Sequence, residues 1–275
     1  MTTTGETRQL TYSEYLKVPE LLQQQTCLAD PSAHDELQFI IVHQVYELWF
    51  KLVRHETGEI HRQMRAGSDT DLRNAIRLCR RVEAIFKVLV GQIHVLESMR
   101  PADFLKFRSA LNPASGFQSV QFREVETAFG LCDEQLASFT KNDPRHEDLL
   151  IAMQEESISD SLYQVLQDKG LDVTSPGKQR TPEQEQKTMA ALKTVYDSPD
   201  ENPMVYDLCE ALVDIDEQLI LWRRHHVMMV ERQIGDKPGT GKGTTGNIDG
   251  IRYLQTTLMR RAFPDLWSVR TLLSD

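Results

Sequence analysis

Two histidines in separate helical patterns are the residues best placed to carry chemistry. His43 follows the apolar run 39–42, and His226 closes a Trp-Arg-Arg-His-His run at 222–226. Each imidazole is expected on an apolar helix face, where a polar group without a partner is costly. From the pattern alone, a hydrogen-bonded core histidine is the commoner explanation. The alternative is that the two imidazoles face each other across a flat, buried cofactor.

Helical geometry separates His226 from its neighbour His225. Successive residues on a helix point about 100° apart, so these two side chains cannot share one face. The residues at helical offsets from His226 are apolar: Ile215, Leu219, Trp222, Met229 and Val230. The row of His225 also includes the polar residues Asp214, Gln218 and Arg232. We therefore expect His226 to point inward, where a neutral imidazole can ligate a metal, and His225 to point toward the surface.

His43 and Arg108 are less constrained by the residues around them. His43 has three open interpretations: a second ligand, an acid–base group or a structural histidine. Arg108 follows Phe104 and Phe107 in a short helical pattern. An arginine flanked by aromatic rings can hold a carboxylate through two hydrogen bonds. A surface ion pair is the competing interpretation of Arg108.

Other catalytic motifs are missing or incomplete. The long helical patterns contain no HExxH or HxxxH, which disfavours zinc hydrolysis, and no GxSxG elbow follows a strand. Residues 239–246, GTGKGTTG, look at first like a phosphate loop. However, Asp236 stands where the first glycine belongs, and Gly243 stands where Ser or Thr should follow the lysine. The loop could instead use Thr240 and backbone N–H groups to close over a small polar ligand.

Composition narrows the class of protein further. The chain has 275 residues, of which 40% are hydrophobic, and this is enough for a sizeable core. A net charge of −10 with both signs mixed disfavours nucleic acid as a partner. The four cysteines form no CxxC motif and are expected to be reduced thiols of a cytoplasmic protein. We expect no membrane partner, since no apolar run approaches the ~20 residues of a membrane span.

Apolar residues recur at helical spacing along almost the whole chain, which predicts an all-α helical bundle. Residues 133–203 are more polar and are interrupted by prolines, so they are expected to form a peripheral insert of short helices and loops. The expected helices cover residues 36–65, 71–99, 101–111, 118–131, 204–234 and 248–262.

Several of these segments together resemble the tryptophan 2,3-dioxygenase family. The matching stretches are residues 34–49 with HDE, FIIVHQ and ELW, residues 104–108, residues 113–119 (PASGFQS), residues 207–214, residues 221–226 and residues 239–241 (GTG). They occur in the order typical of the family and span most of the chain. The SGFQS run and the two histidine contexts are the most specific of them.

The resemblance implies a single all-helical domain over residues 1–275 that encloses haem b, usually in a homotetramer. By position, His226 looks like the proximal ligand of the haem iron. Trp222 would lie beside this ligand, and Ser115 and Gly116 would lie by the haem edge.

The resemblance also implies roles in substrate binding. His43 looks like the distal histidine near the indole N–H, and Phe39 would pack on the indole with Phe104 in the same pocket. Arg108 looks like the clamp for the substrate carboxylate, and Thr240 like the partner of its ammonium group.

The N-terminal arm and one loop complete this picture. Residues 1–31 would form an arm whose Tyr12 and Leu16 reach into the pocket of a neighbouring subunit. The implied reaction uses O₂ to open the C2–C3 bond of L-tryptophan, giving N-formylkynurenine. After the GTG run, residues 242–250 form a longer stretch than is usual in the family, and we expect it to influence substrate choice. Two alternatives stay open: monooxygenation of tryptophan or a β-methyl analogue to an oxindole, and a non-enzymatic haem-binding or sensing protein.

Overall fold

The structure is a computed structural model that describes residues 9–176, 179–235, 237 and 255–273. All regular secondary structure in these ranges is helical, and they contain no strand. The expected all-α class is therefore confirmed. None of the helices in the described ranges has the length and apolar character needed to cross a membrane.

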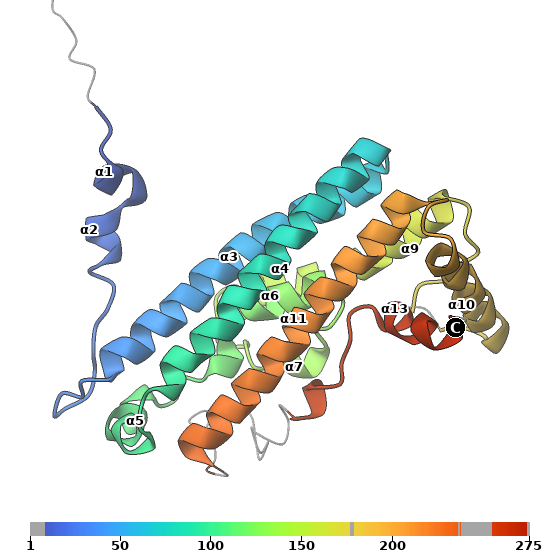
Figure 1. Cartoon of the computed structure of the whole chain (residues 1–275). Helices are drawn as coiled ribbons and strands as arrows, with labels where there is room; N and C mark the ends of the chain where they lie inside the picture. The colour runs from blue at the N-terminus through green and yellow to red at the C-terminus, as the bar shows by residue number, and fades with distance from the viewer. Residues whose placement is uncertain (1–8, 177–178, 236, 238–254, 274–275) are drawn as a thin grey trace, which may run out of the picture.

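Three long helices form the frame of the molecule. They are α3 (Glu36–Ala66), α4 (Asp69–Glu97) and α11 (Pro203–Ile234), and they lie side by side in Figure 1. The reversal between α3 and α4 takes only two residues. Gly67 adopts a left-handed backbone with φ 74°, which a residue without Cβ tolerates best. Ser68 then caps α4 in a reciprocal capping box with Asp71.

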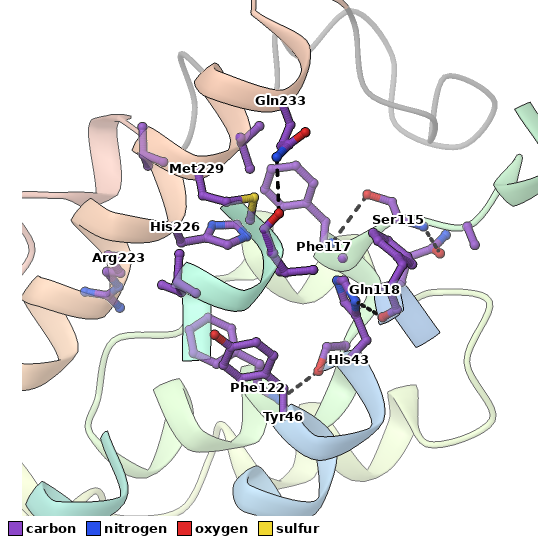
Figure 2. Close-up of a pocket in the computed structure, with 18 of the residues that line it drawn as sticks. His43, Tyr46, Ser115, Phe117, Gln118, Phe122, Arg223, His226, Met229 and Gln233 are labelled. Atoms are coloured by element: carbon purple, nitrogen blue, oxygen red, sulfur yellow. Dashed lines mark hydrogen bonds between the residues drawn. The ribbon is translucent and has the colours of Figure 1, made fainter. Parts of the chain in front are cut away.

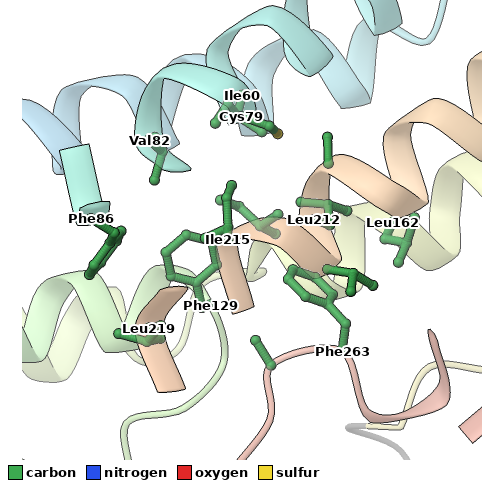
Figure 3. Close-up of a cluster of buried hydrophobic side chains, with 14 of the residues drawn as sticks. Ile60, Cys79, Val82, Phe86, Phe129, Leu162, Leu212, Ile215, Leu219 and Phe263 are labelled. Carbon is green, nitrogen blue, oxygen red and sulfur yellow. The ribbon is translucent and has the colours of Figure 1, made fainter. Parts of the chain in front are cut away.

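The core lies where these three helices face one another, as Figure 3 shows. Ile60 of α3, Cys79 and Val82 of α4, and Leu212 and Ile215 of α11 are all buried. Their spacing within each helix follows the helical repeat, so one apolar stripe per helix is enough to build the core.

Short helices cover this frame and connect its parts. They are α5 (Pro101–Arg108), η1 (Ser109–Leu111), η2 (Gly116–Gln118), α6 (Val120–Ala128), α7 (Glu134–Ser138), α8 (His146–Ala152), α9 (Ile158–Asp168), α10 (Pro182–Asp197), α13 (Pro264–Ser268) and η3 (Val269–Leu272). Helix α9 packs on α3, and its buried residues join the main core. The segment 133–203 therefore holds four short helices, and two of them, α9 and α10, contribute buried residues to the main core.

The helix expected at residues 248–262 is wrong for the part that the structure describes. Only residues 255–257 are helical, and a turn and an irregular segment follow. The reason is that side chains of α11 hold this backbone in place of a helical ladder. Asp216 accepts hydrogen bonds from the N–H groups of Ala262 and Phe263, and Arg223 donates to the carbonyl of Arg260.

The N-terminal segment lies apart from the bundle. Helices α1 (Tyr12–Leu16) and α2 (Val18–Leu21) contain no buried residue and extend away from the other helices in Figure 1. Glu36 ties the end of this segment to α3, because its carboxylate accepts the backbone N–H groups of Leu28 and Ala29.

Candidate active site

A cavity of about 560 Å³ opens between one end of α3, the carboxyl end of α4, the short helices α5 and α6, and the last turns of α11. This volume lies within the range of ordinary cofactor and ligand pockets. Most of the side chains around it are apolar or aromatic. They include Phe39, Tyr46, Phe50, Ile93, Leu96, Met99, Phe104, Phe117, Phe122, Trp222, Val227 and Met229. The polar lining residues are the minority and come from different elements.

His226 reaches into this cavity from α11 (Figure 2). Its ring stacks on the indole of Trp222, with centroids 5.2 Å apart and planes inclined by 9°. Burial lowers the pKa of His226 to about 4, and the nearby His43 and Arg123 act in the same direction. The ring is therefore neutral near pH 7, and neither ring nitrogen forms a hydrogen bond with a residue that the structure describes. A neutral, unpartnered imidazole on a cavity wall has a lone pair available for a metal.

His225 lies on a different face of α11. Its ring packs edge-on against His94 of α4 at 5.7 Å, and it does not line the cavity. The structure thus places His226 toward the cavity and His225 away from it, as the helical offsets predicted.

His43 enters the cavity from α3, across from His226 (Figure 2). Its Nδ1 lies 2.7 Å from the carbonyl oxygen of Phe39. A carbonyl can only accept, so Nδ1 carries the proton, and Nε2 of the neutral ring is an acceptor. Burial lowers the pKa of His43, while the Phe39 carbonyl and Glu47 oppose this shift. His43 is therefore a neutral group with one free lone pair.

An aromatic cluster forms the wall beside His43. The ring of Phe39 lies 4.0 Å from the His43 ring and 5.7 Å from that of Phe104. Phe107 is fully buried behind them and anchors α5. Arg108, the last residue of α5, lines the same cavity. The structure therefore brings together an aromatic wall and a guanidinium group.

Ser115 and Gly116 lie in the turn that closes another side of the cavity. The Ser115 hydroxyl accepts from the N–H of Phe117, and the amide oxygen of Gln118 accepts the Ser115 N–H. Ser119, which follows this turn, donates to the carboxylate of Glu47 on α3 at 2.6 Å. The turn is thereby fixed to the helix that carries His43.

Three groups in the cavity wall were not anticipated from the sequence. Arg123 and Glu126 of α6 and Arg223 of α11 form a buried ion-pair network. The i,i+3 spacing of Arg123 and Glu126, and an arginine next to Trp222, were visible signals of it. Charged residues at this spacing are usually solvated, so the pattern alone does not reveal burial.

Gln233 is a further unanticipated residue, near the end of α11. Its amide nitrogen donates to the carbonyl of Leu96, in the last turn of α4, at 3.2 Å and to that of Met99, just after the helix, at 2.9 Å. This bond joins the helix of His226 to the segment that leads into α5.

The remaining predicted site residues are not part of this cavity as described. Tyr12 and Leu16 are 77% and 45% exposed on α1 and do not line the cavity of their own chain. Thr240 and the stretch 242–250 lie outside the described residues.

The fold and the cavity define a class: an all-helical protein whose aromatic pocket carries two neutral imidazoles, those of His43 and His226, on its wall. Comparison with known proteins is more specific. The family model described as tryptophan 2,3-dioxygenase matches residues 2–176 and 152–273.

Curated relatives agree over nearly the full chain. The tryptophan 2,3-dioxygenase of Anaeromyxobacter sp. (strain K) is 43% identical over 269 residues, which is 96% of each chain. That of Herpetosiphon aurantiacus is 42% identical over 262 residues, or 95% of this chain and 97% of its own length. That of Caulobacter vibrioides is 41% identical over 273 residues. The chain belongs to the tryptophan 2,3-dioxygenase family and is therefore an oxidoreductase.

Proposed function

We propose that this protein uses haem b and O₂ to oxygenate the indole ring of L-tryptophan, opening the C2–C3 bond to give N-formylkynurenine. The observation that carries the proposal is the composition of one cavity. It combines the neutral His226, the acceptor His43, the aromatic rings of Phe39 and Phe104, and the guanidinium of Arg108.

The cavity fits haem in two respects. The imidazole of His226 has no hydrogen-bond partner among the described residues, so a ring nitrogen is available to a metal. In addition, no group of three or more His, Cys, Asp or Glu side chains in the described ranges could hold a metal ion alone. A porphyrin supplies the other four ligands itself, so one imidazole is sufficient. When bound, haem supplies a ferrous iron at which O₂ is activated.

The residues of this chain would orient the substrate. Arg108 would bind the carboxylate, and a fixed carboxylate limits the indole to few orientations. Phe39 and Phe104 would exclude water and pack on the ring. Nε2 of His43, with its proton on the other nitrogen, would accept a hydrogen bond from the indole N–H. Thr240 would meet the ammonium group, a role that rests on the resemblance alone.

Other residues that line the cavity would contact the haem. His226 would ligate the iron, Trp222 would hold its imidazole by stacking, and Ser115 and Gly116 would lie along the haem edge. A Cβ built on Gly116 meets no atom within 4 Å, so this position is open rather than filled by protein.

We also propose that the single domain assembles as a homotetramer in which the arm of residues 1–31 contacts a neighbour. Two observations support this part. Helices α1 and α2 bury no residue on their own chain. The apolar side chains of Tyr12 and Leu16 are exposed there.

Oxygen labelling tests the reaction directly. The reduced, haem-loaded protein is turned over with L-tryptophan under ¹⁸O₂, and the product is analysed by mass spectrometry. Two labels in a ring-opened product are expected. One label in an intact ring would replace this proposal by monooxygenation to an oxindole, and haem binding without any product would favour a sensing protein.

A further inference from the structure

A buried cluster of three charged side chains lies in the wall of the cavity. It consists of Arg123 and Glu126 on α6 and Arg223 on α11, which are 5%, 2% and 4% exposed. Arg223 precedes His226 by three residues, so both lie on neighbouring positions of one helix face. All three side chains line the same cavity as His226.

The cluster contains two cations and one anion. Glu126 accepts from Nη2 of Arg223 at 2.7 Å and, through its other oxygen, from Nη1 of Arg123. Arg223 also donates to the carbonyl of Arg260 at 3.3 Å. Nε of Arg123 is buried and has no acceptor among the residues that the structure describes. Within this cluster, one carboxylate therefore faces two guanidinium groups.

Other carboxylates near the cavity have partners outside the cluster. Asp133 is paired with Arg260 at 2.6 Å. Asp216 accepts from two backbone N–H groups and from Nε1 of Trp267. Burial raises the pKa of Asp216, and the charge of Arg223, seven residues later, is among the influences that oppose this shift. Asp216 therefore faces Arg223, but it lies ten residues before His226, which is about 15 Å along the helix axis. The carboxylate of Glu47, on α3, is held by Ser119 and Gln121.

Arg123 is the cation of the cluster whose charge acts on the proposed iron ligand. Arg123 stands close enough to His226 to disfavour protonation of its ring. In a buried site such a charge acts with less screening than in water. Its effect should therefore extend to a metal held by this imidazole.

We propose that Arg123, Glu126 and Arg223 form a positioning unit that raises the reduction potential of the haem iron bound to His226. Reduction of ferric to ferrous iron adds one electron, taken from an external reductant, and lowers the charge of the site by one. A fixed excess of positive charge in a buried wall stabilises the reduced state relative to the oxidised state. The inference rests on the proposed haem binding, and it explains why a costly buried cation is kept beside the ligand.

Charge variants of opposite sign test this inference. Arg123→Gln removes a positive charge and is expected to lower the midpoint potential of the haem-loaded enzyme. Glu126→Gln removes the negative charge and is expected to raise it. We expect each change to shift the ferrous-to-ferric ratio at a fixed potential about tenfold, which is about 59 mV for a one-electron couple. Arg123→Lys, which keeps the charge, should lie close to the wild type.

An exposed pair with the same spacing provides the matched control. Glu59 and Arg62 form an i,i+3 ion pair on the surface of α3, away from the cavity lining. Glu59→Gln and Arg62→Gln should leave the midpoint potential unchanged, because solvent screens these charges.

The measurement is a spectroscopic redox titration of purified, haem-loaded proteins. Opposite shifts for Arg123→Gln and Glu126→Gln support the inference. Equal potentials, or shifts of the same sign, would show that the cluster only holds α6 against α11. If Arg123→Gln does not fold, Arg223→Gln removes the same charge and takes its place. Folded variants that bind no haem would make the cluster a determinant of haem binding and overturn the inference. A wild-type protein that binds no haem would instead refute the proposed function.

Discussion

Acidification of the haem-free protein tests the environment of His226. Burial lowers the pKa of this imidazole from 6.5 to about 4 in the folded chain. In the unfolded chain the ring is solvated and titrates near its ordinary value. The unfolded state therefore binds one more proton than the folded state between these two values.

The sign of the effect follows from this difference. Stability falls as the pH drops through 6.5 and stops falling near pH 4, where the folded protein also takes up the proton. Each pH unit in the window costs about 1.4 kcal/mol, so His226 contributes a loss of at most about 3 kcal/mol. If the ring partly faces water in the haem-free cavity, its pKa shift is smaller and the loss of stability is smaller too. We expect this loss of unfolding free energy to be at least about 1 kcal/mol.

The assay compares wild type with His226→Gln, a variant whose side chain does not titrate. Urea unfolding is followed for both haem-free proteins from above pH 6.5 to near pH 4. All other groups titrate in both proteins, so the difference between the two curves isolates His226. The wild type should lose more stability than the variant as the pH falls. Parallel curves would refute the reasoning, because they would mean that the His226 ring is as solvated in the folded chain as in the unfolded one.

Three further predictions concern substrate binding, catalysis and thiol reactivity. Arg108→Ala should raise the KM for tryptophan at least tenfold, since a charged hydrogen bond is worth ~1.5–3 kcal/mol. In steady-state kinetics, the KM for an indole that lacks the carboxylate should hardly change. An equal rise in KM for both substrates would make Arg108 structural. His43→Ala should retain measurable turnover, because one neutral hydrogen bond contributes about 0.5–1.5 kcal/mol; complete loss of product with haem and tryptophan binding intact would make His43 an obligatory base. A thiol reagent should label the exposed Cys27 rapidly in the native protein and leave Cys79 and Cys209 unlabelled until unfolding, because burial raises the pKa of both thiols to about 12. Mass spectrometry of the labelled peptides is the measurement, and rapid labelling of Cys79 or Cys209 in the native protein would contradict the prediction.

The helical frame was predictable because it depends on a local repeat. The periodic apolar residues are enough to define α3 and α4 within a few residues. The same repeat was enough to choose His226 over His225 as the cavity-facing ring. The segment after residue 257 was not predictable in this way, because Asp216 fixes its backbone from another helix.

The burial of the charged residues in the cavity wall was also not predictable from the local sequence. Arg123 and Glu126 have the spacing of an ordinary surface ion pair, and so do Glu59 and Arg62. The pair of Arg123 and Glu126 is buried in contact with Arg223 of α11, whereas the pair of Glu59 and Arg62 stays exposed. Long-range contacts of this kind depend on how helices distant in sequence meet, which no local pattern contains.

The stacking of Trp222 on His226 gives the protein an intrinsic optical probe. The chain has three tryptophans, and Trp222 is the one whose indole lies flat against the proposed ligand. Haem absorbs at the wavelengths where indole emits, and energy transfer falls steeply with distance. Filling the cavity should therefore extinguish the emission of Trp222 more completely than that of Trp49 or Trp267. The side chain that fixes the orientation of the imidazole would thus also report, in fluorescence and without any added label, whether the haem is in place.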